Sequence, residues 1–180
     1  MIKDINTAKI RRGDRSEFRR MVDKKIDKLH ATAIRICCNT EDAKDIVQET
    51  FVKVWEKRSI LKEEASLDAF LYRVTVNKCY DLLRKRKRNS GDDAGIDVLK
   101  FFAGDQDADK KLNDDEVNAA LNTLTDKLSI KQKIVFTMVE LEDKSHDEVA
   151  LATGMSKNSV KSNLRHARKK MENFAEEYIK

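Results

Sequence analysis

The chain has 180 residues and a net charge of +5, with 38% charged residues, no proline and only five glycines. Because proline and glycine interrupt helices most strongly, their scarcity predicts an all-α fold. The three cysteines (Cys37, Cys38 and Cys79) show no framework spacing, and the chain has neither a signal-peptide core nor an apolar run of membrane-spanning length. These features exclude a disulfide-rich secreted protein and membrane insertion, and they predict a cytoplasmic location.

Charge divides the chain into three blocks. Residues 1–90 carry 23 Lys and Arg against 14 Asp and Glu, residues 91–116 carry 3 against 9, and residues 117–180 carry 11 against 9. Basic modules favour polyanionic partners through counterion release. We therefore expect two small helical domains, residues 1–90 and 114–180, joined by a flexible acidic linker over residues 91–113.

Three amphipathic helices are predicted in the N-terminal domain. Apolar residues recur at helical spacing between Asp14 and Cys38, and again in EDAKDIVQETFVKVWEKR, which Thr40 can cap. A third helix, LDAFLYRVTVNKCYDLLRKRKR, can begin at a Ser66 cap. We expect it to fray within the consecutive bases at residues 84–88.

In the C-terminal domain, helical periodicity resumes at Asp114, and two capping boxes, SIKQ and SHDE, each predict a helix start. The second box opens the stretch SHDEVALATGMSKNSVKSNLRHARKKM, which is typical of a helix-turn-helix. Small Ala150 lets the two helices approach, Gly154 tolerates the positive φ of a sharp turn, and Val160 faces the angle between the helices.

The second helix of this motif has a polar face suited to DNA. Asn and Arg can bond base edges, while Lys and Ser suit phosphates. A solvated face of a helical bundle is the alternative, but the spacing of the small, glycine and β-branched residues favours DNA binding. The predicted contacts are Lys157, Asn158, Ser159, Lys161, Ser162, Arg165 and Lys169.

The run DAKDIVQETFVKVWEKR, followed by LDAFLYRVTVNKCYDLLRKRKR, resembles conserved region 2 of bacterial RNA polymerase sigma factors. The segment LSIKQKIVFTMVELEDKSHDEVALATGMSKNSVKSNLRHARKKM resembles their region 4. Both regions in this order, with a short acidic linker between them, are similar to the extracytoplasmic-function group (group IV) of the sigma-70 family. The resemblance implies a three-helix region 2 that binds core polymerase and recognises and melts the −10 element. It also implies a region 4 helix-turn-helix that recognises the −35 element as duplex.

Partners and contact residues also follow from the resemblance. Core RNA polymerase would be bound through its β′ clamp helices and β flap, and an anti-sigma factor is a further implied partner. The implied clamp-helix contacts, for which a solvated acidic face is the alternative, are Asp42, Asp45, Gln48, Glu49, Val52 and Lys53. The implied contacts to the opened −10 strand are Lys62, Glu63, Ser66, Tyr72, Arg73, Asn77, Lys78, Tyr80, Asp81 and Arg84.

Two positions depart from the family pattern. Phe70 stands in FLYRV where tryptophan is common, and it keeps the aromatic bulk. Ser129 follows Leu128 where the family usually has proline, and it replaces a first-turn proline by a helix cap. Neither departure touches the implied contacts.

No enzyme site is predicted. The run Ser145-His146-Asp147 contains the residue types of a hydrolase triad, but neighbouring residues at a helix start diverge, whereas a triad needs convergent side chains. His30 and the vicinal pair Cys37-Cys38 lack a second ligand pair for a metal, and no phosphate-binding loop occurs. We therefore expect no metal and no cofactor. Two other functions stay open: a stand-alone helix-turn-helix regulator of duplex DNA, and a helical adaptor that contacts only proteins.

Overall fold

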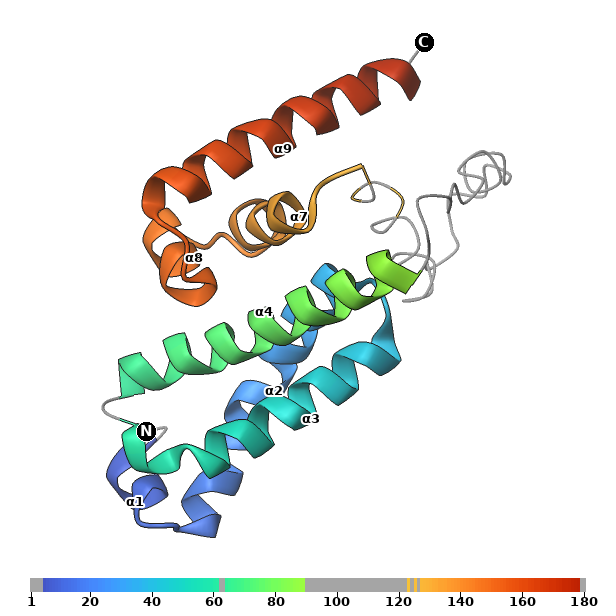
Figure 1. The fold of residues 1–180 in the computed structure, drawn as a ribbon. Coiled ribbons are helices and arrows are strands. Elements are labelled where there is room, and N and C mark those ends of the chain that lie inside the picture. The colour runs from blue at the N-terminus through green and yellow to red at the C-terminus, as the bar shows by residue number, and fades with distance from the viewer. Residues whose placement is uncertain (1–4, 62–63, 90–122, 124, 126, 179–180) are drawn as a thin grey trace, which may run out of the picture.

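The computed structural model describes residues 5–61, 64–89, 123, 125 and 127–178, and within them every regular element is a helix, which confirms the all-α prediction. The expected linker, residues 91–113, lies outside the described residues. Figure 1 shows an N-terminal and a C-terminal module, one above the other. The N-terminal module contains α1 (Thr7–Arg11), α2 (Arg15–Cys37), α3 (Thr40–Glu56), the 3₁₀ turn η1 (Arg58–Ile60) and α4 (Glu64–Asn89). The C-terminal module contains α7 (Ile130–Phe136), the π-helical turn η2 (Thr137–Leu141), α8 (His146–Thr153) and α9 (Lys157–Tyr178).

Side-chain caps fix where the first long helices begin. The Asp14 carboxylate accepts hydrogen bonds from two backbone N–H groups at the start of α2. The cap of α3 is Asn39, which accepts from the backbone N–H of Asp42, so the expected Thr40 cap is wrong by one residue. The start of α4 at Glu64 also corrects an expectation, since it places Ser66 in the first turn and not at the cap.

The basic end of α4 is helical as far as Asn89. The expected fraying within residues 84–88 is therefore wrong. One physical reason is that Arg86 forms an ion pair with Asp42 of α3, which ties the last turns of α4 to the neighbouring helix.

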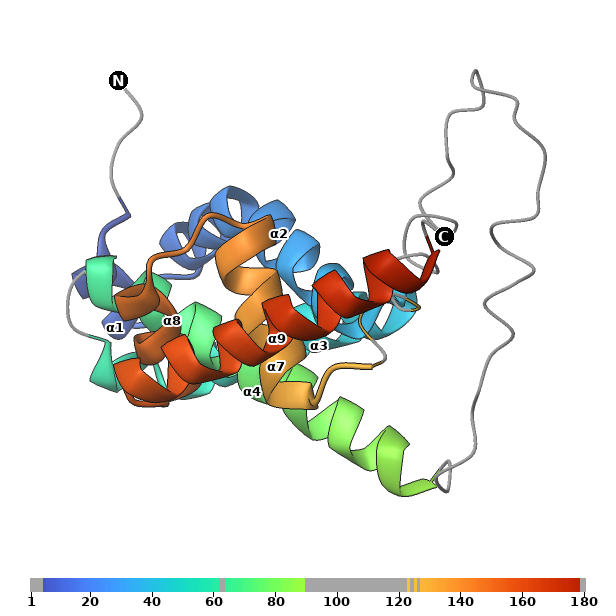
Figure 2. The ribbon, with the colours of Figure 1, turned by 90° about the horizontal axis from the view of Figure 1, so that it is seen from above.

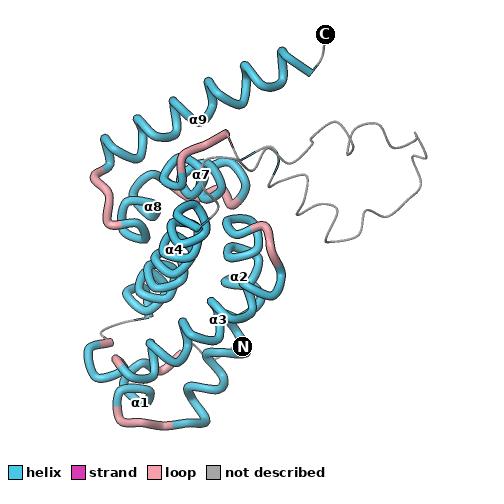
Figure 3. The backbone as a smooth tube through the Cα atoms, turned by 45° about the vertical axis from the view of Figure 1, so that its right-hand side comes forward, coloured by secondary structure: helices cyan, strands magenta, loops and turns pink. Residues whose placement is uncertain are grey.

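The N-terminal module is a bundle in which α2, α3 and α4 pack on one another (Figure 3). Its core contains fully buried side chains from each helix, among them Met21, Leu29 and Ile36 of α2, Val54 of α3 and Leu67 of α4. The short helix α1 was not expected, because one buried residue, Ile10, gives too little apolar periodicity to predict a helix.

The helix-turn-helix is formed by α8 and α9. The predicted capping boxes at Ser129 and Ser145 are both present and begin α7 and α8. Gly154 ends α8 with φ 71°, and the Ser156 hydroxyl accepts from the backbone N–H of Ser159, as expected of a cap. Val160 is fully buried, so the predicted turn geometry is confirmed.

The two modules share one continuous apolar core. Figure 3 shows α4 between the C-terminal helices on one side and α2 and α3 on the other. Helices α7 and α8 pack against α4, and η2 also contacts α2. Figure 2 shows α9 crossing above this contact, on the outer side of the C-terminal module. The face of α4 that touches the second module is thus buried, while α9 stays open to solvent along much of its length.

Candidate DNA-binding and polymerase-binding surfaces

The polar face of α9 is open. Six of the seven predicted duplex contacts are exposed, and only Ser159 is half-buried. Its hydroxyl lies 3.9 Å from Met155 Sδ, and Asn163 donates to its backbone oxygen at 2.8 Å, so Ser159 helps to build the helix start. At the same end, Lys157 donates to Asp147 at 2.8 Å, and this hydrogen bond lowers the pKa of Asp147.

A shallow groove of about 490 Å³ follows α9 toward its C-terminal end. It brings together the predicted Lys161, Arg165 and Lys169 with His146 and Arg168, which the sequence analysis did not select. Arg168 donates to Glu140 of η2 at 2.9 and 2.6 Å, so that guanidinium supports the module. The groove is cationic on balance, as a phosphate-binding surface requires.

The predicted −10 residues of α4 do not share one face. Arg73, Asn77, Asp81 and Arg84 are exposed and recur at three- and four-residue steps, which places them along one side of the helix. Tyr80 is half-buried. Lys62 and Glu63 lie outside the described residues, and Ser66 is placed only by its backbone, in the first turn.

The Lys78 side chain contacts α3. Its ammonium group forms an ion pair with Glu49 of α3, one of the predicted polymerase contacts. Arg86 of α4 pairs with Asp42, another predicted polymerase contact, in the first turn of α3. The α3–α4 edge therefore joins residues predicted for strand contact to residues predicted for polymerase contact.

Tyr72 faces the C-terminal module. Its ring lies 4.7 Å from the ammonium nitrogen of Lys144, in a cation–π contact. Burial, reinforced by the nearby Glu142 carboxylate, raises the pKa of Tyr72 to about 12. Tyr72 is half-buried in this structure, whereas Arg73 and Asn77 are exposed.

The predicted polymerase face of α3 is accessible. Asp45, Gln48, Glu49 and Lys53 are exposed, Val52 is 55% exposed, and Asp42 is half-buried by its ion pair. An isolated apolar residue of that exposure is unremarkable, but Val52 also lines a groove.

This groove is apolar, has a volume of about 940 Å³ and runs between α2 and α3. Phe18, Val22 and Ile26 line it from α2, and Phe51 and Trp55 line it from α3. The Phe18 and Trp55 rings meet edge to face at 4.8 Å. The sequence analysis missed the groove because its α2 residues belong to the apolar stripe that was expected to be buried.

The remaining polar features have structural explanations. Ser145 donates its hydroxyl to Glu148 within the capping box and not to His146. The three cysteines are unpaired, and the described residues contain no metal-binding group of three or more His, Cys, Asp or Glu. None of the described helices is long and apolar enough to cross a membrane.

The helix-turn-helix has an exposed basic face on α9. The neighbouring helical bundle has a row of exposed polar residues along α4. Together these features define a two-module helical DNA-binding protein. Residues 21–89 match the protein family described as "Sigma-70 region 2", and residues 118–171 match the family described as "Sigma-70, region 4". RNA polymerase sigma factor SigV of Bacillus subtilis is 31% identical over 134 residues, which cover 74% of this chain and 75% of SigV. The chain belongs to the sigma-70 family, in its extracytoplasmic-function group.

Two further proteins are similar. ECF RNA polymerase sigma factor SigE of Mycolicibacterium smegmatis is 24% identical over 155 residues, which cover 86% of this chain; the chain spans only 60% of SigE. The sigma factor RpoE of Bartonella quintana, solved with the anti-sigma factor NepR, shares the fold with a TM-score of 0.62 at 19% identity. That likeness covers 89% of this chain and 97% of RpoE. Membership of this family confirms the prediction that the chain is a sigma factor, a non-enzymatic protein that directs transcription initiation.

Proposed function

We propose that this chain binds core RNA polymerase in the cytoplasm, reads the −35 element with α9 and holds the opened −10 strand with α4. The observation that carries the proposal is the open cationic face of α9 behind the Gly154 turn. A helix entered through such a turn can lie in the major groove, where Asn158 and Arg165 can bond base edges.

The exposed line of Arg73, Asn77 and Arg84 supports the strand contact. A single strand held outside the duplex offers unpaired base edges and phosphates, which amide and guanidinium groups can bind. Asp81 lies on the same line and disfavours a phosphate at that position, so we assign it to base contact.

For polymerase binding, the supporting feature is the open face of α3 beside the α2–α3 groove. A polar rim around an apolar centre is the usual composition of a protein interface. We assign this surface to the β′ clamp helices and the C-terminal module to the β flap. An anti-sigma factor, as in the RpoE complex with NepR, is the further proposed partner.

The test is reconstituted transcription with core polymerase across a pool of promoters. The wild-type chain should initiate from a subset that shares −35 and −10 elements. Arg165→Ala should lower initiation from that subset about tenfold or more, as expected when a bidentate base contact is lost. Arg19→Ala, which removes an exposed arginine of α2 outside the proposed surfaces, is the matched control and should behave as wild type. Tight operator binding without any polymerase complex would instead indicate a stand-alone regulator.

A further inference from the structure

The histidine of the Ser145-His146-Asp147 run lies on the proposed DNA surface. Ser145 begins α8 through its capping box with Glu148, and Asp147 accepts a hydrogen bond from Lys157 at 2.8 Å. The His146 side chain instead lines the groove of about 490 Å³ along α9. The rest of the described lining comes from α9, so His146 is the contribution of α8 to this groove.

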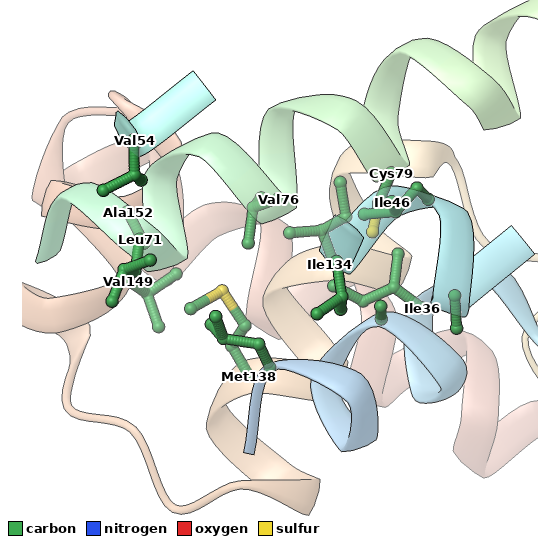
Figure 4. Close-up of a cluster of buried hydrophobic side chains, with 14 of the residues drawn as sticks. Ile36, Ile46, Val54, Leu71, Val76, Cys79, Ile134, Met138, Val149 and Ala152 are labelled. Carbon is green, nitrogen blue, oxygen red and sulfur yellow. The ribbon is translucent and has the colours of Figure 1, made fainter. Parts of the chain in front are cut away.

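Buried contacts hold the first turn of α8 in place beside α9. Figure 4 shows Val149 and Ala152 of α8 close to Leu71 of α4. All three side chains are at most 2% exposed, so α8 is anchored by apolar burial. Leu164 of α9, which lines the groove, is only 3% exposed. Because both helices are anchored, the His146 side chain and the polar face of α9 keep fixed positions relative to each other.

The charged groups around His146 are mainly cations. Four of them line the groove from α9: Lys161, Arg165, Arg168 and Lys169. Three carboxylates lie nearby: Glu172 in the groove, Asp147 of α8 and Glu140 of η2. Two of these carboxylates are engaged, Asp147 by Lys157 and Glu140 by Arg168.

The cations on the α4 side of α8 are directed elsewhere. Lys144 lies over the Tyr72 ring of α4, and Arg73 of α4 lies near Gly154, at the opposite end of α8. The balance at His146 is therefore set by the groove. A positive charge on its ring adds to the repulsion among the groove cations until an anion lies between them.

A DNA phosphate in the groove would supply that anion. An imidazolium can donate hydrogen bonds from both ring nitrogens, whereas the neutral ring donates from one, and bonds between charged partners are the stronger. The N-terminus of α8 adds backbone N–H groups and the positive end of a helix dipole. Histidine is also the side chain whose charge normally changes between about pH 5 and 8. Binding of a duplex is thus expected to favour the protonated ring.

We infer that His146 is a proton-dependent phosphate contact of the −35 surface, so that promoter affinity rises as pH falls through the neutral range. The inference rests on the proposed function for its ligand, duplex DNA, and adds a residue outside the recognition helix α9. The sign follows from linkage: if the complex binds more protons than the free chain, the association constant falls as pH rises. Uptake of one proton limits that fall to about tenfold per pH unit.

The three histidines of the chain provide matched variants for a test on the holoenzyme. H146Q keeps a neutral hydrogen-bonding side chain, and H146K fixes a positive charge at the same position. H166Q is the control, because His166 is exposed on α9 and does not line the groove. Fluorescence anisotropy measures binding of a labelled promoter duplex between about pH 6 and 8 at constant ionic strength. Comparison of the variants at each pH removes the pH dependence of the polymerase itself.

Relative to H146K, wild-type affinity should fall about fivefold between pH 6 and 8, and H166Q should follow wild type. H146Q should bind more weakly than H146K by a factor that does not change with pH. At the lower pH, the slope of log K against log salt concentration should be steeper for wild type than for H146Q by up to about 0.9, the contribution of one neutralised phosphate. A duplex truncated downstream of the −35 element should show none of these differences.

Parallel pH profiles and equal salt slopes for wild type and H146Q overturn the inference. The same differences on the truncated duplex also overturn it, because they would place the effect away from the −35 contact. Unfolding of a variant is recognised separately by circular dichroism, and H146K and H146Q each test the residue independently. Failure of the proposed function is distinct, since it would appear as no promoter binding and no transcription at any pH, whichever residue stands at this position.

Discussion

Gly154, between α8 and α9, is expected to resist replacement by alanine because of backbone strain alone. It adopts φ 71° and ψ 10°, in the left-handed region that a Cβ disfavours. A Cβ there would approach its nearest atom, Arg73 Nη2, only to 4.0 Å, so no collision adds to the strain. The left-handed conformation costs an L-residue about 1–2 kcal/mol. For a chain of this size, that lowers Tm by about 2–8 °C.

Thermal unfolding followed by circular dichroism measures this loss. Asparagine adopts the left-handed region more readily than alanine, so Gly154→Asn should lower Tm less than Gly154→Ala. Well below Tm, both variants should still bind a −35 duplex, because the α9 contacts are untouched. An unchanged Tm for the alanine variant, or equal losses for both, would refute the assignment of the cost to φ.

Three further outcomes test other surfaces. Ser145→Ala removes the acceptor for the Glu148 N–H at 3.2 Å, and urea unfolding should report a loss of about 1 kcal/mol. The capping bonds also lower the pKa of Glu148, so its contribution to stability is present above the ordinary glutamate pKa and is lost as pH falls through the lowered folded value. The alanine variant should therefore show a flatter acid limb, and an identical pH profile would contradict this. Asn77→Ala should impair promoter opening in permanganate footprints while core binding in gel shifts is kept, and lost core affinity would instead place α4 at the protein interface. Val52→Asp should weaken core polymerase binding about tenfold, with Tm unchanged because the side chain is 55% exposed, and wild-type core affinity would remove Val52 from that surface.

The elements that could be predicted from sequence are those whose signal is local. In α3, the buried positions Ile46, Val47 and Val54 recur at helical steps, so periodicity alone locates the helix and its buried side. The helix-turn-helix carries its own turn chemistry in Gly154 and its own cap in Ser145. Such features do not depend on the rest of the fold.

Errors arose where neighbouring residues offer equivalent chemistry. Asn39 and Thr40 are both favourable N-cap residues by type. Asn39 is the cap because its side-chain oxygen accepts the hydrogen bond from the Asp42 N–H. Ser66 is a plausible cap by type, but α4 begins two residues earlier, at Glu64. The consecutive basic residues at the end of α4 were expected to repel one another and to fray the helix. The sequence does not indicate that Asp42 of α3 lies beside Arg86 and forms an ion pair with it.

The docking of the modules could not be predicted from sequence for a different reason. Leu71 and Val76 are apolar at helical spacing, and that pattern says only that they are buried, not by which partner. The α2–α3 groove was missed for the converse reason, since Ile26 fits the buried stripe and yet is 40% exposed. Periodicity identifies an apolar face, whereas the tertiary contact decides what covers it.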